Sequence, residues 1–185
     1  MNEDMNRRSF LKLNFKSTVL FLNEVIKPHI EIERTCHRPP GAGDELEFLS
    51  LCNGCGECQS VCPTGTITLS GLETGMNIVN RPYLRLNEYP CNFCGSCIDV
   101  CVTHALDRSR MDDAIGRGKI LKQYCKAYAN IMCDYCVRAC TKVGAMDIKD
   151  FCYPVINQEL CNGCGFCVQA CIHNEKGIEI QVIST

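Results

Sequence analysis

Four groups of cysteines stand out along the chain, because their spacing is regular enough to place several thiols around one small centre. In three groups the cysteines follow one another at intervals of three, three and four residues. The other group has seven residues between its first two cysteines and then the same intervals of three and four. In chain order, motifs 1 to 4 comprise Cys52, Cys55, Cys58 and Cys62; Cys91, Cys94, Cys97 and Cys101; Cys125, Cys133, Cys136 and Cys140; and Cys161, Cys164, Cys167 and Cys171.

The spacing predicts ligands of an iron–sulfur centre. Three cysteines at i, i+3 and i+6 can curl a loop around one face of a compact inorganic core, and a fourth lies one helical turn further on. This is the spacing of bacterial [4Fe–4S] ligand runs, in which the fourth cysteine binds the neighbouring cluster. Glycines beside the cysteines, such as Gly54 and Gly56, let backbone N–H groups approach the sulfides.

We therefore expect the motifs to work in pairs that exchange their fourth cysteines, although ligation by each motif's own fourth cysteine stays open at this point. Motif 3 departs from the common spacing, which favours a more labile cluster there or none. We expect three or four [4Fe–4S] clusters per chain. The predicted ligand sets are Cys52, Cys55, Cys58 and Cys101; Cys62, Cys91, Cys94 and Cys97; Cys125, Cys133, Cys136 and Cys171; and Cys140, Cys161, Cys164 and Cys167.

Two other uses of cysteine fit the pattern less well. Structural zinc sites draw their ligands from two separate C-x₂₋₄-C pairs, whereas evenly spaced triplets suit a cubane. Disulfides are rare in a reducing compartment. The remaining cysteines, Cys36 and Cys152, have no partners at cluster spacing and are expected to be small buried side chains. His37 and His104 lie near cysteines, but four thiolates already complete each set.

The elements that must position these ligands are short. Apolar pieces precede or follow the motifs and predict strands packed against brief helices. A helix is expected to begin in residues 43–48, with Asp44 as its cap. The fold class predicted is α+β, a tandem of two dicluster ferredoxin-like units over residues 43–110 and 111–185. The pieces predicted as strands are residues 64–69, 83–86, 103–106, 119–124, 142–148, 153–157 and 176–183.

Composition narrows the class of protein further. The net charge of −2 leaves no basic footprint for nucleic acid. The chain holds no run of 18 apolar residues, so no transmembrane segment is expected. Tryptophan is absent and aromatic residues make up 7% of the chain. A protein with so few aromatic side chains for its core needs additional stabilisation, and bound metal clusters can supply it.

The N-terminal segment, residues 1–42, contains "NRRSFLKLNF" at positions 6–15, which matches a twin-arginine export motif. Its apolar continuation, residues 19–22, is cut short by Asn23 and Glu24, and no A-x-A-like cleavage site follows. A working signal, a remnant read by a partner and a plain amphipathic helix all remain open. We expect a cytoplasmic protein, with export to the periplasm by the twin-arginine route as the alternative.

The order of the motifs resembles that of the NapF-type ferredoxins of periplasmic nitrate reductase systems. The likeness rests on "RRSFLK", on "RPPGAGDELEFLSLC", on two regular motifs, on "CKAYANIMCDYCVRAC" and on "YPVINQELCNGCGFC". The resemblance implies a protein with several [4Fe–4S] clusters that is not an enzyme. It also implies binding to the precursor of the nitrate reductase catalytic subunit and help with its iron–sulfur maturation before export.

Two other functions compete with a maturation role. The chain could be a one-electron carrier that feeds a nitrate reductase or another reductase through possible redox partner proteins. It could also be an electron-transfer subunit exported in folded form. Iron–sulfur clusters serve all three roles, so the motifs alone do not separate them.

Overall fold

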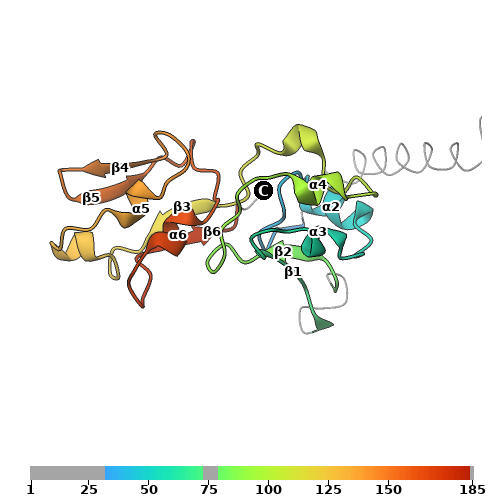
Figure 1. Ribbon diagram of the computed structural model, residues 1–185, viewed down its shortest axis with the longest axis horizontal. Coiled ribbons are helices and arrows are strands. Elements are labelled where there is room, and N and C mark those ends of the chain that lie inside the picture. Colours follow the sequence, from blue (N-terminus) through green and yellow to red (C-terminus); the bar gives the residue numbers. More distant parts are fainter. Residues whose placement is uncertain (1–31, 73–78, 184–185) are drawn as a thin grey trace, which may run out of the picture.

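The computed structural model describes residues 32–72 and 79–183, which include all 18 cysteines. The twin-arginine-like sequence at positions 6–15 therefore lies outside the described residues. Within them the chain forms two units that lie side by side along the long axis of the molecule (Figure 1). The strands and helices are short, three to seven residues each, as expected of a chain that wraps compact centres.

The described residues of the first unit form short helices and one hairpin. Helix α2 begins after Asp44, whose carboxylate accepts a hydrogen bond from the Glu47 N–H at 2.9 Å, so the predicted cap is confirmed. The strands β1 and β2 pair antiparallel. The elements are α2 (Glu45–Leu51), α3 (Glu57–Ser60), β1 (Ile67–Leu69), β2 (Pro82–Leu84), α4 (Ser96–Asp99) and η3 (Arg108–Arg110).

The second unit repeats this plan with longer strands. The hairpin β4–β5 lies between α5 and α6 in the chain, as β1–β2 lies between α3 and α4, and strands β3 and β6 pair antiparallel in a separate two-stranded sheet. The elements are β3 (Arg117–Ile120), η4 (Lys126–Ala129), α5 (Tyr135–Arg138), β4 (Met146–Lys149), β5 (Tyr153–Ile156), α6 (Phe166–Ala170) and β6 (Ile178–Gln181). The α+β ferredoxin-like prediction is thus confirmed.

Two of the predicted strands differ from the structure. Residues 103–106 form no strand, and only Leu106 makes an isolated bridge, with Ala42. The piece predicted over residues 119–124 is strand only to Ile120, because the chain then turns, with the Cys125 N–H bonding to the Leu121 carbonyl at 2.9 Å. Residues 103–106 of the first unit and residues 121–124 of the second therefore form fewer hydrogen bonds between strands than the apolar pattern predicted.

The residues before α2 belong to the first unit's packing. Arg38 is 2% exposed, and its guanidinium lies between Glu45, the Pro82 carbonyl and the Phe48 ring. The His37 carbonyl accepts from the Leu84 N–H at 2.8 Å. A charge can be buried only when it is paired and hydrogen-bonded, and Arg38 is both. The "RPP…GDE" sequence is therefore a structural clasp.

One core runs through both units. Its members include Phe48, Ile67, Leu86, Val168 and Ile180, packed together with several of the cysteines. Between the units, the Asn87 side chain accepts from the Ile180 N–H at 2.7 Å and donates to the Ile180 carbonyl at 3.1 Å. This pair of bonds attaches the loop after β2 to strand β6.

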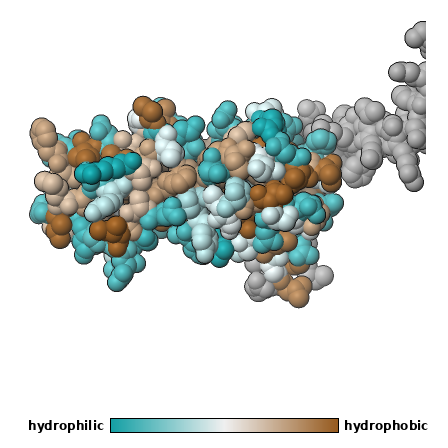
Figure 2. Space-filling view, in the orientation of Figure 1, coloured by the Kyte–Doolittle hydropathy of each residue, from teal (hydrophilic) through white to brown (hydrophobic). Residues whose placement is uncertain are grey.

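The surface is less uniform than the core. Figure 2 shows apolar side chains on the face of both units, separated by hydrophilic ones. The second unit exposes more of the large apolar residues, and Met132, Val143 and Phe151 are almost fully exposed. Within the described residues, none of the helices combines the length and the apolar character needed to cross a bilayer.

Candidate metal centres

The structure gathers the cysteines of the four motifs around four separate cavities. Each cavity takes three thiols from one motif and the fourth from the other motif of the same unit. Sites 1 to 4 are lined by Cys52, Cys55, Cys58 and Cys101; by Cys62, Cys91, Cys94 and Cys97; by Cys125, Cys133, Cys136 and Cys171; and by Cys140, Cys161, Cys164 and Cys167. These are the sets that the exchange of fourth cysteines predicts, although ligation itself stays a prediction.

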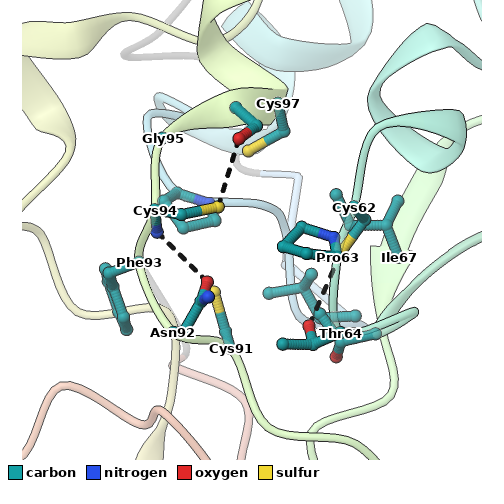
Figure 3. Close-up of a pocket in the computed structure, with 14 residues that line it drawn as sticks. Cys62, Pro63, Thr64, Ile67, Cys91, Asn92, Phe93, Cys94, Gly95 and Cys97 are labelled. Atoms are coloured by element: carbon teal, nitrogen blue, oxygen red, sulfur yellow. Dashed lines mark hydrogen bonds between the residues drawn. The ribbon is translucent and has the colours of Figure 1, made fainter.

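The exchange follows from the short helices. In site 2 the motif 2 cysteines face Cys62, which arrives from the end of α3 with Pro63 behind it (Figure 3). Helix α3 holds Cys58 at site 1, and the chain leaves it at Cys62, so one turn of helix separates two ligand sets. Helices α4, α5 and α6 connect their third and fourth cysteines in the same way.

Left-handed glycines begin three of these helices. Gly56, Gly95 and Gly165 cap α3, α4 and α6 with φ of 83°, 80° and 86°. A residue with a Cβ is strained there, and a Cβ on Gly165 would lie 2.6 Å from the Leu86 carbonyl oxygen. Glycine thus lets the loop turn into the helix beside the cysteines.

An asparagine side chain forms a hydrogen bond with the backbone of each of the same three loops. The side chains of Asn53, Asn92 and Asn162 accept from the backbone N–H of the second cysteine two residues later, at 3.2, 3.2 and 3.3 Å. Such Asx turns hold the loop in a fixed curve. Motif 3 lacks both devices: Asp134 caps α5 with φ −136°, and the η4 helix fills the longer spacing. Its four cysteines reach their cavity nevertheless.

Burial keeps the thiols protonated when nothing binds them. It raises the pKa of Cys58 and Cys97 to about 12, with neighbouring thiolates adding to the effect. The pKa of Cys91 and of Cys136 rises to about 11 for the same reasons. Four like charges in one apolar cavity need a cation to offset them, so iron must displace the protons as it binds.

Cys62 is the exception among the buried thiols. Its burial acts to raise the pKa, but hydrogen bonds from the Thr64 hydroxyl and from the backbone at Thr64, Thr66 and Ile67 outweigh that effect and lower it. Elsewhere the Gly118 N–H donates to Cys161 Sγ at 3.3 Å. Donors of this kind stabilise sulfur that carries negative charge, as in the reduced state of a cluster.

The cavities fit a polynuclear cluster better than a single ion. The four sites are alike in size: the space between their lining atoms, counted with open solvent at the mouth, is about 310, 370, 320 and 320 Å³ for sites 2, 1, 3 and 4. In the described part of the chain, no three His, Cys, Asp or Glu side chains converge on one ion. Zinc would need sulfurs about 2.3 Å from a shared centre. None of the 18 cysteines, all of them described, forms a disulfide.

The other residues considered from the sequence lie elsewhere. Cys36 lines none of the four cavities, and burial raises its pKa. Cys152 donates to the Ala127 carbonyl at 3.4 Å. His37 contacts the Ile115 carbonyl at 3.1 Å, and burial lowers its pKa, whereas His104 is exposed. The sequence reasoning passed over His173, which lines site 3 two residues after the last motif cysteine.

Paired units of short strands, each wrapped around two thiol-lined cavities by exchanged cysteines, define a bacterial-type dicluster ferredoxin class. Comparison with known proteins agrees. Residues 51–105 match the 4Fe-4S dicluster domain family, and residues 154–174 match the 4Fe-4S binding domain family.

Whole-chain relatives identify the family. The Escherichia coli ferredoxin-type protein NapG is 31% identical over 164 residues, which cover 80% of this chain and 71% of NapG. The Paracoccus denitrificans methylamine utilization ferredoxin-type protein MauM is 30% identical over 173 residues, covering 86% and 77%. The E. coli ferredoxin-type protein NapF is 28% identical over 141 residues, covering 72% and 79%.

The chain belongs to the family of ferredoxin-type 4Fe–4S proteins that includes NapG and MauM. It is an iron–sulfur electron-transfer protein, not an enzyme, and it binds multiple [4Fe–4S] clusters. The resemblance to NapF seen in the sequence is thus part of a wider likeness, in which NapG and MauM match at somewhat higher identity.

Proposed function

We propose that each of the four sites holds one [4Fe–4S] cluster through its four cysteines and that the four clusters form a single row for one-electron transfer. Each cluster, when bound, supplies one-electron redox chemistry. The chain's own residues hold it in a largely apolar cavity and donate N–H and O–H groups to sulfur. The observation that carries the proposal is the convergence of all sixteen motif thiols on four cavities.

Contacts along the chain support the order of the row. Sites 1 and 2 are joined through α3 and α4, and sites 3 and 4 through α5 and α6, which pack together in pairs. Sites 2 and 4 meet where the Cys91 N–H donates to the Cys164 carbonyl at 2.7 Å. The order is therefore site 1, site 2, site 4, site 3, with the two inner sites on either side of the boundary between the units.

Maturation of a nitrate reductase is the second candidate function. It rests on the NapF-like order of motifs and on the similarity to E. coli NapF across both units. In this role the protein binds the precursor of the periplasmic nitrate reductase catalytic subunit in the cytoplasm and assists assembly of its iron–sulfur centre before export. Arg38 and Glu45 of the "RPP…GDE" sequence are buried in the fold, so these two side chains are not available for contact with a client.

Iron and sulfide analysis of anaerobically prepared protein tests the first proposal. About sixteen irons and sixteen sulfides per chain are expected, since each cubane holds four of each. Low-temperature EPR of the reduced protein should show interacting S = 1/2 centres, as neighbouring clusters in one row would give. A colourless, well-folded protein loaded with zinc, or about twelve irons or fewer after reconstitution, would contradict it.

Capture and fractionation separate the two candidate functions. The full chain used as bait should retain a precursor that lacks its cofactors if it acts in maturation. A plain electron carrier should retain only folded redox proteins. Cytoplasmic location is part of the maturation proposal, and finding the protein shortened at its N-terminus in the periplasm would establish the exported alternative.

A further inference from the structure

In motifs 1, 2 and 3 the residue two positions after the fourth cysteine contacts the sulfur of that cysteine. The Thr64 hydroxyl lies 3.6 Å from Cys62 Sγ, and the Thr103 hydroxyl lies 3.7 Å from Cys101 Sγ. At the corresponding place in motif 3, Cys140 Sγ donates to the Lys142 carbonyl at 3.4 Å. In motif 4 this position is His173, two residues after Cys171.

His173 is oriented differently from an ordinary surface histidine. It lines site 3 together with the four cysteines of that site. Its Nε2 atom is shielded from solvent and has no hydrogen-bond partner among the described residues. Three other buried side-chain nitrogens there lack a hydrogen-bond partner, and all are arginine Nε atoms outside site 3, of which Arg34 Nε lies 3.4 Å from the Glu45 carboxylate.

An unpartnered buried nitrogen requires an explanation. Leaving such a group without a hydrogen bond disfavours the fold, and an absent bound group is one of the usual reasons for it. The cavity beside this nitrogen is lined by four thiols and has the size shared by the other three sites. A cluster in site 3 would bring sulfur to the place where Nε2 lacks a partner.

We propose that His173 donates a hydrogen bond from Nε2 to a sulfur of the cluster in site 3 and thereby raises the reduction potential of that cluster. The inference rests on the proposed occupancy of site 3. Reduction adds negative charge to the sulfurs, so a donor stabilises the reduced form more than the oxidised form. Sites 1 and 2 have a threonine hydroxyl at this position, so His173 sets the outermost cluster of the second unit apart.

Potentiometric titration of the anaerobic full-length protein, followed by EPR at one fixed pH, tests this assignment. His173→Phe keeps a ring of similar shape but has no donor, and it should shift one of the four potentials to a more negative value. His173→Gln offers an amide N–H and should restore part of the shift. His104→Phe is the matched control: this exposed histidine lines none of the four cavities and should change no potential.

Labelling gives a second readout, whose main signal is measured on the wild-type protein. In wild-type protein labelled with ¹⁵N-histidine, pulsed EPR should detect one weakly coupled nitrogen that is lost in His173→Phe. A strongly coupled nitrogen would make His173 an iron ligand and overturn the assignment. Unchanged potentials in His173→Phe, or no coupled nitrogen, would also overturn it.

Iron analysis of the wild type separates this inference from the function on which it rests. Sixteen irons together with unchanged potentials in His173→Phe would defeat the hydrogen bond alone. A wild-type protein with only about twelve irons, and no cluster assigned to Cys133 and Cys136, would instead show that site 3 is empty and defeat the occupancy proposal.

Discussion

In the first unit a buried ion pair closes the chain around its two sites, whereas the second unit closes with a pair of four-residue strands. Ala42 and Leu106 make only one bridge at the position where β3 and β6 form a ladder. Arg38, four residues before Ala42, is paired with Glu45 and bonded to the Pro82 carbonyl, so it attaches the segment before α2 to that helix and to β2. The comparison shows that the fold requires its outer ends to be joined but accepts different means of joining them.

The units also differ in how they curve around their sites. Both motifs of the first unit use a left-handed glycine and an asparagine side chain, but in the second unit only motif 4 does. Motif 3 has instead the η4 helix and the contact between the tilted rings of Tyr128 and Tyr153, whose centroids are 4.9 Å apart. We expect the second unit to be uneven, with a firm inner site 4 and a looser outer site 3.

The largest expected effect is the difference between removing a cysteine of site 4 and removing a cysteine of site 3. Cys164→Ala should remove about four irons and also weaken site 2, because Cys164 is buried at the junction and its carbonyl bonds to the Cys91 N–H. Cys133→Ala should remove about four irons from site 3 only. Iron content and thermal unfolding by circular dichroism measure both. Loss of all clusters in Cys133→Ala would contradict the expectation that site 4 is held more firmly than site 3.

Removing the clasp tests what closes the first unit. Arg38→Met leaves the buried Glu45 paired only with Arg34, whose Nε lies 3.4 Å from the carboxylate, and should lower the free energy of unfolding by about 3 kcal/mol, the low end for a broken buried pair. Arg138→Met in the second unit removes a pair with Asp134 in which the arginine is 77% exposed, so its expected effect is about 0–1 kcal/mol. Denaturant titration under anaerobic conditions compares the two. Equal effects would mean that the clasp is dispensable.

Two glycines with nearly the same φ distinguish local strain from packing at the junction. Gly56→Ala should lower stability by about 1–2 kcal/mol, because a Cβ there meets only Leu69 Cδ1 at 3.3 Å. Gly165→Ala adds a clash with the Leu86 carbonyl of the other unit, so about 2–5 kcal/mol is expected. The shift in the denaturation midpoint measures both. A larger loss of stability in Gly56→Ala than in Gly165→Ala would mean that the close packing between the units does not lie at Gly165.

The smallest expected effect is kinetic. On addition of an iron chelator, about four irons should leave several-fold faster than the rest, because motif 3 lacks the glycine cap and asparagine bond of the other motifs. Absorbance of the released iron complex gives the time course. Cys133→Ala should lack the fast phase. A fast phase that persists in this variant would assign the labile cluster to another site.

The sequence predicted the grouping of thiols well, because ligand spacing is a local property that a short loop and one helical turn enforce. It predicted β1, β2, β4, β5 and β6 from short apolar runs, with ends that differ by a few residues. The prediction of a strand at residues 103–106 was wrong. Apolar alternation indicates burial, and Leu106 is buried, but only a partner strand decides whether a ladder forms.

Other features depend on contacts between residues far apart in the chain. The order of the sites follows from one hydrogen bond between Cys91 and Cys164, which no local pattern encodes. The role of Arg38 needed the position of Pro82, 44 residues away. His173 could have been found by aligning the positions that follow each fourth cysteine, where two threonines already indicated contact with sulfur.

The exchanged cysteines have a consequence for synthesis of the protein on the ribosome, where chains emerge and fold from the N-terminus. A nascent chain that ends before Cys97 already carries six of the sixteen motif cysteines, but none of the four predicted ligand sets is complete. Sites 2 and 1 then become complete within a few residues of each other, at Cys97 and Cys101. Sites 4 and 3 follow in the same way at Cys167 and Cys171. Metal insertion should therefore proceed in two bursts, one for each unit, and the first can end before translation reaches Cys125.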